Sequence, residues 1–312
     1  MSSPSASAIT PARAWLPLWL VLAAIWGSSF MLIKVGLEGF TPLQLASLRT
    51  SSGAVTVVIV VLLLGQRLPS SRTAWLHCSI VGVLLAGIPA VLFAWAETHI
   101  TSVLAGLFNA ATPLFTALAG LLIARDQHIG RNRTAGLTLG ILGVGLMLGV
   151  WQGVSGSLAG SVAAIGATVC YGFGLQWQQR FLTPRAERPE PLVAAQLLVA
   201  GALLILTDAL TGSLASTEWQ LRPTVAVLVL GAVGSGIAFV LFYRVLRLAG
   251  ALTAASITYA TPIVSTLLGV VLLGEALTWN QPAGALLVLT GVALVQGFFR
   301  PLPEPVTNRP RG

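Results

Sequence analysis

The chain has 312 residues, of which 55% are hydrophobic and only 8% are charged. A soluble domain carries about 25% charged residues, so this composition excludes a protein with an ordinary water-exposed surface. The formal charge of +8 does not indicate nucleic-acid binding, because the basic residues are dispersed and form no basic stripe with interleaved aromatic residues.

Apolar runs recur along the whole chain, and each is long enough for a membrane-spanning helix, which takes about 20 residues. The sequence lacks the ~10-residue segments of alternating polarity that a membrane barrel needs, so it predicts an all-helical integral membrane protein. Charged, proline and glycine residues divide the runs into ten expected spans. In chain order these are 15–34, 43–64, 74–96, 101–123, 134–150, 157–179, 191–210, 223–245, 251–273 and 282–299.

Lysine and arginine predict the orientation, because cytoplasmic loops carry an excess of both. With the N-terminus in the cytoplasm, fourteen of the 17 basic residues face the cytoplasm, Lys34 and Arg222 face outward, and Arg49 lies inside a span. The sequence therefore predicts a multi-pass protein of the inner membrane with both termini cytoplasmic.

The two halves of the chain resemble each other. Residues 105–120 align without gaps with 254–269, and 136–148 match 284–296. Trp26-Gly27 has a weaker echo in Tyr171-Gly172. Each repeat holds five spans, an odd number, so the second must be inserted upside down relative to the first. We expect a tail at 1–14, repeats at 15–150 and 157–299, and a second tail at 300–312, with both tails cytoplasmic.

Several motifs resemble the drug/metabolite transporter superfamily, EamA type. They are WGSSF (26–30), Arg49 in the second span, and A-x(7)-P-x(6)-G in both repeats, followed in the second repeat by LLGEAL (272–277). The resemblance covers essentially the whole chain and implies a ten-helix secondary transporter, commonly an exporter of amino acids or related metabolites. The first repeat departs from the pattern, with ARDQH (124–128) where the second has LGEAL.

Inverted repeats place a binding site near the midplane of the membrane, with two related gates. We expect that site to use residues with polar, aromatic or helix-breaking character at membrane depth. The candidates for a substrate cavity are Trp26, Ser29, Arg49, Asn109, Pro113, Thr116, Tyr171, Thr258, Tyr259, Pro262 and Ser265.

Arg49 needs an explanation, because a charge at the centre of a bilayer costs at least about 2.5–3.5 kcal/mol. It could line a cavity or a gate and face a substrate carboxylate or an acid such as Glu97. It could equally brace the helices near a helix end by bonding backbone carbonyls.

Asn109 shares a helix stripe with Pro113 and Thr116. Pro113 removes a backbone hydrogen bond, so a carbonyl near position 109 must find another partner, such as water or a substrate ammonium group. Asn109 could therefore line the cavity, or it could bond a neighbouring helix. In the ninth span, Thr258, Thr261, Pro262 and Ser265 form the inverted counterpart.

The remaining candidates also have two interpretations. Trp26, Tyr171 and Tyr259 could stack on a substrate or anchor the membrane interface, and Ser29 could line the cavity or allow close packing beside Gly27. Glu97 and His99, at the outer end of the third span, are candidates for gating or proton transfer, or are ordinary surface groups. Glu275 is expected to end the ninth span and to interact with a neighbouring helix terminus.

The function expected is secondary transport by alternating access, with export of small metabolites such as amino acids. The partners are a small-molecule substrate and the lipid bilayer, and no cofactor, metal or nucleic acid is expected. A phosphate-binding GxxxxGK[ST] motif does not occur in the sequence. The alternatives are a structural or regulatory membrane protein without transport and a polytopic membrane enzyme. The second is disfavoured because His77, His99 and His128 lie at span edges.

Overall fold

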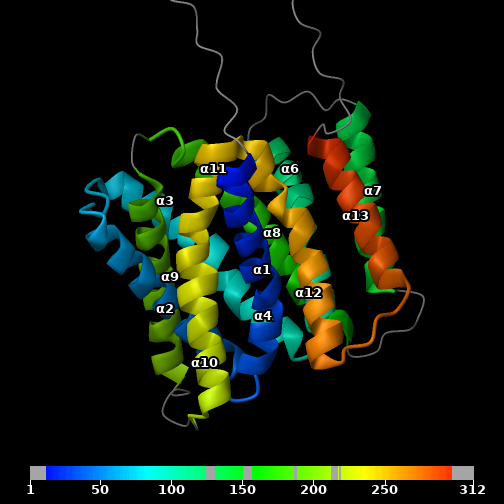
Figure 1. The fold of residues 1–312 in the computed structure, drawn as a ribbon, viewed down its shortest axis with the longest axis horizontal. Helices are drawn as coiled ribbons and strands as arrows, with labels where there is room; N and C mark the ends of the chain where they lie inside the picture. The colour runs from blue at the N-terminus through cyan, green and yellow to red at the C-terminus, as the bar shows by residue number, and fades with distance from the viewer. Residues whose placement is uncertain are drawn as a thin grey trace, which may run out of the picture.

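The computed structural model describes residues 12–123, 131–149, 157–185, 188–211, 217 and 219–296. The regular elements in these ranges are helices (Figure 1). The first half of the chain forms α1 (Ala12–Gly36), α2 (Pro42–Leu63), α3 (Arg72–Gly82), the π-helix η1 (Val83–Gly87), α4 (Ile88–Glu97), α5 (Ser102–Asn109), α6 (Thr112–Ile123) and α7 (Arg131–Leu148). The second half forms α8 (Ser157–Phe181), α9 (Pro189–Thr211), α10 (Leu221–Val229), the π-helix η4 (Leu230–Ile237), α11 (Ala238–Ala255), α12 (Ile257–Leu273) and α13 (Asn280–Gln296).

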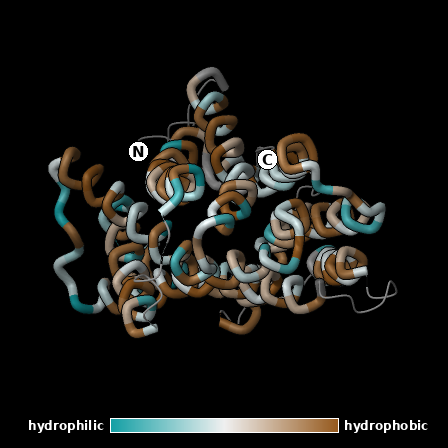
Figure 2. Tube along the Cα trace, turned by 90° about the horizontal axis from the view of Figure 1, so that it is seen from below, coloured by the Kyte–Doolittle hydropathy of each residue, from teal (hydrophilic) through white to brown (hydrophobic). Residues whose placement is uncertain are grey.

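The helices have the length and the surface of membrane spans. Seven helical segments are long and apolar enough to cross a bilayer, and Thr134–Leu148 and Ile257–Leu273 are shorter apolar helices. Large hydrophobic side chains are exposed on the outside of the bundle, such as Leu210 at 80% and Leu286 at 66%. Seen from below in Figure 2, hydrophobic residues dominate the outside of the bundle as well as its interior. The expectation of an all-helical membrane protein is confirmed.

Local sequence explains where several helices begin and end. Thr41 accepts a hydrogen bond from the backbone of Gln44, whose side chain bonds back, so a capping box starts α2 with Pro42 in its first turn. Thr101 caps α5 in the same way through the backbone N–H of Leu104. Gly274 ends α12 in a left-handed conformation with φ 66°, which favours glycine.

The last helices of the two halves, α7 and α13, pack side by side (Figure 1). A Cβ on Gly143 would lie 2.7 Å from the carbonyl oxygen of Gly284, and a Cβ on Gly284 would lie 2.6 Å from that of Gly143. Gly136 and Gly291 meet in the same reciprocal way, at 2.6 and 2.5 Å. Since 136 aligns with 284 and 143 with 291, these two contacts map onto each other when the halves are exchanged. We call these four residues the glycine seam.

A second pair of contacts follows the same exchange. Gly27 of α1 packs directly on Val264 of α12, and Gly172 of α8 packs on Phe115 of α6, where an added Cβ would lie 2.6 Å from the Phe115 carbonyl carbon. Position 115 aligns with 264, so the echo between Trp26-Gly27 and Tyr171-Gly172 corresponds to equivalent packing in the structure. Small residues let helix backbones approach closely, as is common between membrane helices.

The two π-helices also lie at related places, each within a long helical run. Gly82 precedes η1 and packs on the backbone of Gln196 in α9, while Gly231 in η4 packs on the backbone of Arg49 in α2. Such π-segments often occur at functional sites, because they shift the side chains that follow.

One expected boundary is wrong. We expected a connection between the spans 223–245 and 251–273, but α11 continues to Ala255 and the helix breaks at Ser256. The sequence between 246 and 250 contains arginine and glycine but no proline, so nothing in it prevents the helix from continuing.

Candidate functional site

A cavity of about 210 Å³ lies in the middle of the bundle. Both halves of the chain contribute to its wall, through α1, α2, η1, α4, α5 and α6 from the first and α8, α9, η4, α11 and α12 from the second. Helices α7 and α13, which pack on each other through the glycine seam, contribute none of the described residues of this wall. The cavity is therefore enclosed by the helices that precede the seam in each half.

Six of the residues predicted for a cavity line this one. They are Trp26, Ser29, Arg49, Asn109, Tyr171 and Thr258. Most of the remaining wall residues are apolar or small residues that the sequence analysis did not single out. The wall is therefore mostly apolar with a few polar groups. This composition is typical of small-molecule sites.

Arg49 is the charged residue of the wall. It lies two turns into α2, and its Nε donates a hydrogen bond to Ser235 Oγ of η4 at 3.3 Å. The guanidinium thus both lines the cavity and bridges the two halves of the chain. Gly82 packs on the backbone of Gln196 in α9, just as Gly231 packs on the backbone of Arg49 in α2. When the two halves are exchanged, Gln196 therefore corresponds to Arg49. The second half thus has a neutral amide at the related position.

Aromatic rings form a large part of the wall. Trp26 donates from its indole nitrogen to the Gly234 carbonyl at 3.3 Å, and its ring centroid lies 6.2 Å from that of Phe239 in an edge-to-face arrangement. On the other side, the ring centroids of Phe93 and Tyr171 are 5.8 Å apart. Hydrogen bonding and ring packing fix these side chains, so the cavity has a defined shape.

Asn109 lies where the expected fourth span is interrupted. Helix α5 ends at Asn109, Ala110 and Ala111 form a turn, and α6 begins at Thr112 with Pro113 in its first turn. The hydroxyl of Thr112 donates to the Asn109 carbonyl at 2.7 Å. The carbonyl that we expected to need water or a substrate therefore has a partner within the chain. The Asn109 side-chain oxygen has a longer contact with the same hydroxyl, at 3.4 Å.

Five predicted residues lie away from the cavity wall. Thr116 donates to the Thr112 carbonyl, Tyr259 donates to Gln296 of α13, and Ser265 is buried against Gly106 and donates to the Pro262 carbonyl. Pro113 starts α6, whereas Pro262 lies inside the continuous helix α12. The helix stripe carries Asn109 toward the cavity, but the turn at 110–111 rotates the residues that follow.

Glu97 and His99 have different surroundings. His99 is exposed; its ring centroid lies 4.3 Å from that of Trp95 in a tilted arrangement, and its Nδ1 lies 2.7 Å from the Thr98 hydroxyl. Glu97 is fully buried, so its interpretation as an ordinary surface group is wrong. It ends α4, a helix on which α1, α2, α5 and α8 pack.

Two charged residues clamp the turn between α4 and α5. Lys34 of α1 donates to the carbonyls of Glu97 and Ile100, at 2.6 and 3.1 Å. Glu275, just after α12, accepts from the backbone N–H of Ser102 at 2.8 Å and of Val103 at 2.9 Å, and from the Ser102 hydroxyl at 3.0 Å. The prediction that Glu275 interacts with a helix terminus is confirmed. A carboxylate at a helix N-terminus is stabilised by the free N–H groups and by the helix dipole.

The sequence analysis missed several residues of the wall. These are Phe30, Ile33, Thr50, Leu85, Ala86, Ala90, Phe93, Thr112, Leu175, Leu197, Gly234, Ser235 and Phe239. Thr261, which was expected in the inverted counterpart of the Asn109 stripe, also lines the wall. The run GAVGSGI (231–237) carried one usable signal, because several glycines around a serine in an apolar span mark close approach of helices. The phenylalanines carried none, since an apolar span is rich in them on every face.

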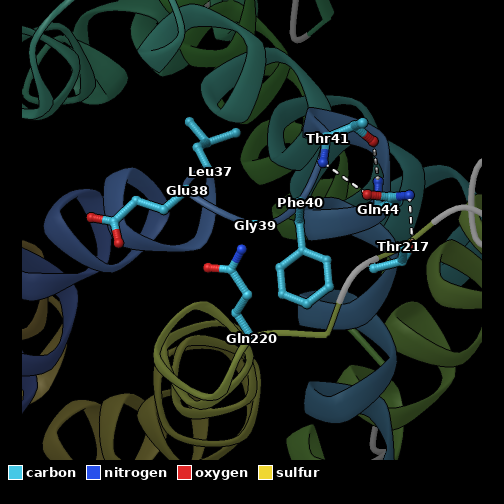
Figure 3. Close-up of a pocket in the computed structure, with 8 residues that line it drawn as sticks. All are labelled: Leu37, Glu38, Gly39, Phe40, Thr41, Gln44, Thr217 and Gln220. Atoms are coloured by element: carbon cyan, nitrogen blue, oxygen red, sulfur yellow. Dashed lines mark hydrogen bonds between the residues drawn. The ribbon is translucent and has the colours of Figure 1, made fainter.

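A second, wider recess lies on the surface beside the turn between α1 and α2 and has a volume of about 370 Å³ (Figure 3). Gln44 both completes the capping box of α2 and donates to the Thr217 hydroxyl at 2.9 Å. The polar groups of this recess therefore hold the surrounding loops together. Within the described ranges, no group of three His, Cys, Asp or Glu side chains could hold a metal ion.

Comparison with known proteins gives consistent findings. Residues 13–149 and 158–296 each match the EamA-like transporter family. The "Uncharacterized inner membrane transporter YedA" of Escherichia coli is 28% identical over 91% of this chain and 92% of its own. The "Probable amino-acid metabolite efflux pump" of Salmonella typhimurium is 27% identical over 90% of this chain and 94% of its own. The "Uncharacterized transporter YvbV" of Bacillus subtilis is 26% identical over 88% of each chain.

A solved crystal structure has a related fold. It superposes with a TM-score of 0.64, covers 91% of this chain and 97% of its own, and is 23% identical in sequence. The helical arrangement described above therefore exists in an experimentally determined protein.

Proposed function

Because the chain belongs to the EamA-like transporter family, we propose that this multi-pass inner-membrane transporter exports small metabolites such as amino acids by alternating access. Two relatives carry names that support parts of this proposal. One is named as an inner membrane transporter, and one as an amino-acid metabolite efflux pump. The substrate, the direction and the mechanism are our proposals for this chain.

The observation that carries the substrate class is a single arginine in a small aromatic cavity. Arg49 presents a positive charge to a space of about 210 Å³ whose wall is otherwise mostly apolar. Drug-sized ligands occupy cavities of about 300–1,000 Å³, so this cavity suits a smaller molecule. A guanidinium binds a carboxylate with matched geometry, and the rings of Trp26 and Tyr171 suit an apolar body. A carboxylate-bearing metabolite with an apolar side chain fits both features.

The orientation of the substrate follows from the asymmetry between the halves. The first half supplies Arg49 to the wall, whereas the neutral Gln196, at the related position of the second half, is not among the wall residues. A zwitterion would therefore place its carboxylate toward α2. Asn109, whose amide NH2 has no hydrogen-bond partner among the described residues, is available for the polar remainder of the substrate.

For the architecture, we propose ten transmembrane helices as two inverted repeats, 15–150 and 157–299, with cytoplasmic tails 1–14 and 300–312. The reciprocal contacts of the glycine seam support the inversion, because they exchange when the repeats exchange. The described ends of the chain, at the start of α1 and the end of α13, lie at the same end of the bundle (Figure 1). Inverted repeats of this kind let a central site open alternately to the two sides.

The proposal is tested by flux in proteoliposomes. Purified protein should mediate saturable exchange of at least one radiolabelled amino acid or related carboxylate. Arg49→Gln should weaken apparent affinity by about 1.5–3 kcal/mol, the usual contribution of a hydrogen bond to a charged group. Arg222→Gln is the control, because Arg222 pairs with Glu38 on the surface at 3.2 Å. Folded protein without saturable flux for a broad panel would contradict transport of this substrate class.

A further inference from the structure

Glu97 has the most unusual surroundings of the acidic residues that the structure describes. Its side chain is 0% exposed, and neither carboxylate oxygen has a hydrogen-bond partner within the described ranges. The other acidic residues at this end of the molecule have partners: Glu275 accepts three hydrogen bonds, and Glu38 pairs with Arg222. Glu97 therefore has no structural role comparable to theirs.

The position of Glu97 connects the cavity to the clamped turn. Phe93, one helical turn earlier on α4, lines the cavity, so Glu97 lies on the same face of α4 just beyond the cavity wall. The next residues form the turn that Lys34 and Glu275 hold. A change at Glu97 can thus act on the cavity and on the closure of this end.

The charged groups around Glu97 come from three places. Lys34 of α1, Arg49 of α2 and Glu275 after α12 are the charges that act on it. His99 follows in the same turn but is exposed, α5 carries no charged residue, and the charge on α8 is Arg180 in its last turn. Lys34 directs its ammonium group to two backbone carbonyls, including that of Glu97 itself.

An ionised carboxylate is expensive to bury without hydrogen bonds, whereas a protonated carboxyl is far less so. We propose that the Glu97 carboxyl binds one proton while this end of the molecule is closed and releases it to solution when this end opens. The O–H bond is the only bond made or broken, and the proton comes from the solution and returns to it. Coupling of this proton to solute movement rests on the transport function proposed above, whereas the proton site itself does not.

The clamp supplies the link between the proton and the opening. Once ionised, Glu97 attracts the Lys34 ammonium away from the carbonyls at the end of α4 and repels the Glu275 carboxylate that caps α5. Both contacts that hold the turn between α4 and α5 are then weakened. Loss of the proton therefore favours the open state, and binding of the proton favours the arrangement described here, in which Glu97 is buried.

Infrared difference spectroscopy tests the proton site directly. The purified full-length protein in lipid nanodiscs should show a band of a protonated carboxyl C=O that disappears as the pH is raised. That band should be missing in Glu97→Gln and present in Glu38→Gln, a glutamate at the same end of the molecule. An unchanged band in Glu97→Gln overturns the proposal. If Glu97→Gln is not recovered folded, Glu97→Asp decides, because its band must shift relative to that of the unmodified protein and an unshifted band overturns the proposal.

Thiol labelling tests the link to opening. A Cys78→Ala, Cys170→Ala background with Ser29→Cys places a reporter in the cavity, and an impermeant reagent is applied on the Glu97 side. Labelling should accelerate as pH rises, and Glu97→Gln should abolish this pH dependence. If labelling of Ser29→Cys still accelerates with pH in Glu97→Gln, the link between Glu97 and opening is overturned. A titrating Glu97 band without solute flux would refute the transport proposal and leave the proton site standing. Solute flux without that band would refute the proton site and leave the transport proposal standing.

Discussion

Two asparagine side chains of the molecule have opposite surroundings. The amide of Asn280 donates to the carbonyls of Leu146 and Met147 at the end of α7, at 3.2 and 3.3 Å. Asn109 lines the cavity, and its nearest hydroxyl, that of Thr112, is already bonded to a backbone carbonyl. The first amide holds helices together, and the second is available to a ligand.

We therefore expect different results from the same substitution at the two sites. Asn109→Leu should keep a stable fold and weaken the apparent affinity for substrate by about 1–2 kcal/mol, some five- to thirtyfold. Asn280→Leu should lower stability by about 1–3 kcal/mol, because it leaves carbonyls unpaired, with affinity unchanged in the surviving protein. Flux kinetics and thermal unfolding in detergent measure the two effects. Equal loss of stability in both variants would place Asn109 in the packing.

At the scale of the helix, Glu275 joins the second half of the chain to the start of α5. Glu275→Gln should reduce stability by about 1–3 kcal/mol, because the charge-assisted bonds to Ser102 and Val103 are replaced by weaker ones. Glu38→Gln, which removes an exposed ion pair, should change stability by only about 0–1 kcal/mol. Thermal unfolding of both variants under the same conditions provides the comparison. A similar loss of stability in the two variants would mean that the bonds of Glu275 to the start of α5 contribute no more than an exposed ion pair.

The two aligned prolines should differ in effect. Pro113 begins α6 after the turn at 110–111, so Pro113→Ala allows α5 and α6 to merge into one helix and should reduce flux while expression is maintained. Pro262 lies inside α12, so Pro262→Ala leaves that helix continuous and should change flux less. Flux normalised to the amount of folded protein distinguishes the two. Equal flux in both variants would show that the turn does not depend on Pro113.

The helices could be predicted from the sequence far better than their irregularities. Helix occupies most of the described part of every expected apolar segment, because about 20 apolar residues in a bilayer have few alternatives to a helix. The π-helices η1 and η4 have no local signal, since they depend on how Gly82 and Gly231 pack on other helices. Of the cavity candidates that failed, Thr116 and Ser265 donate their hydroxyls to carbonyls of their own helices. Glu97 was misjudged because burial by four other helices is not visible along one segment.

For the whole molecule, the orientation can be tested by labelling from each side of the membrane. In a background of Cys78→Ala and Cys170→Ala, Arg188→Cys should react with an impermeant thiol reagent only from the cytoplasmic side. Gln220→Cys should react only from the outside, because one span separates the two positions. Reaction of Arg188→Cys from outside would contradict the arrangement of ten spans with cytoplasmic ends.

The glycine seam gives a second prediction for the whole molecule. Gly143→Leu places a side chain against the backbone of α13 and should destabilise the protein by about 1–3 kcal/mol or more, as overpacking does. Gly145→Leu is the matched control on the same helix, because no atom lies within 4 Å of an added Cβ there. The fraction that stays monodisperse after heating in detergent reports the difference. Equal survival of the two variants would show that α7 and α13 separate easily.

The same seam also determines when the protein can be complete during its synthesis. Domains generally begin to fold from the N-terminus as the chain leaves the ribosome, yet α7 must wait for α13, the last described helix. The first half thus stays in the membrane as an unfinished intermediate until α13 has been synthesised. A message truncated after Trp279 should therefore yield a chain that membrane proteases remove. Premature termination just before α13 would be as damaging to this protein as termination in the first half.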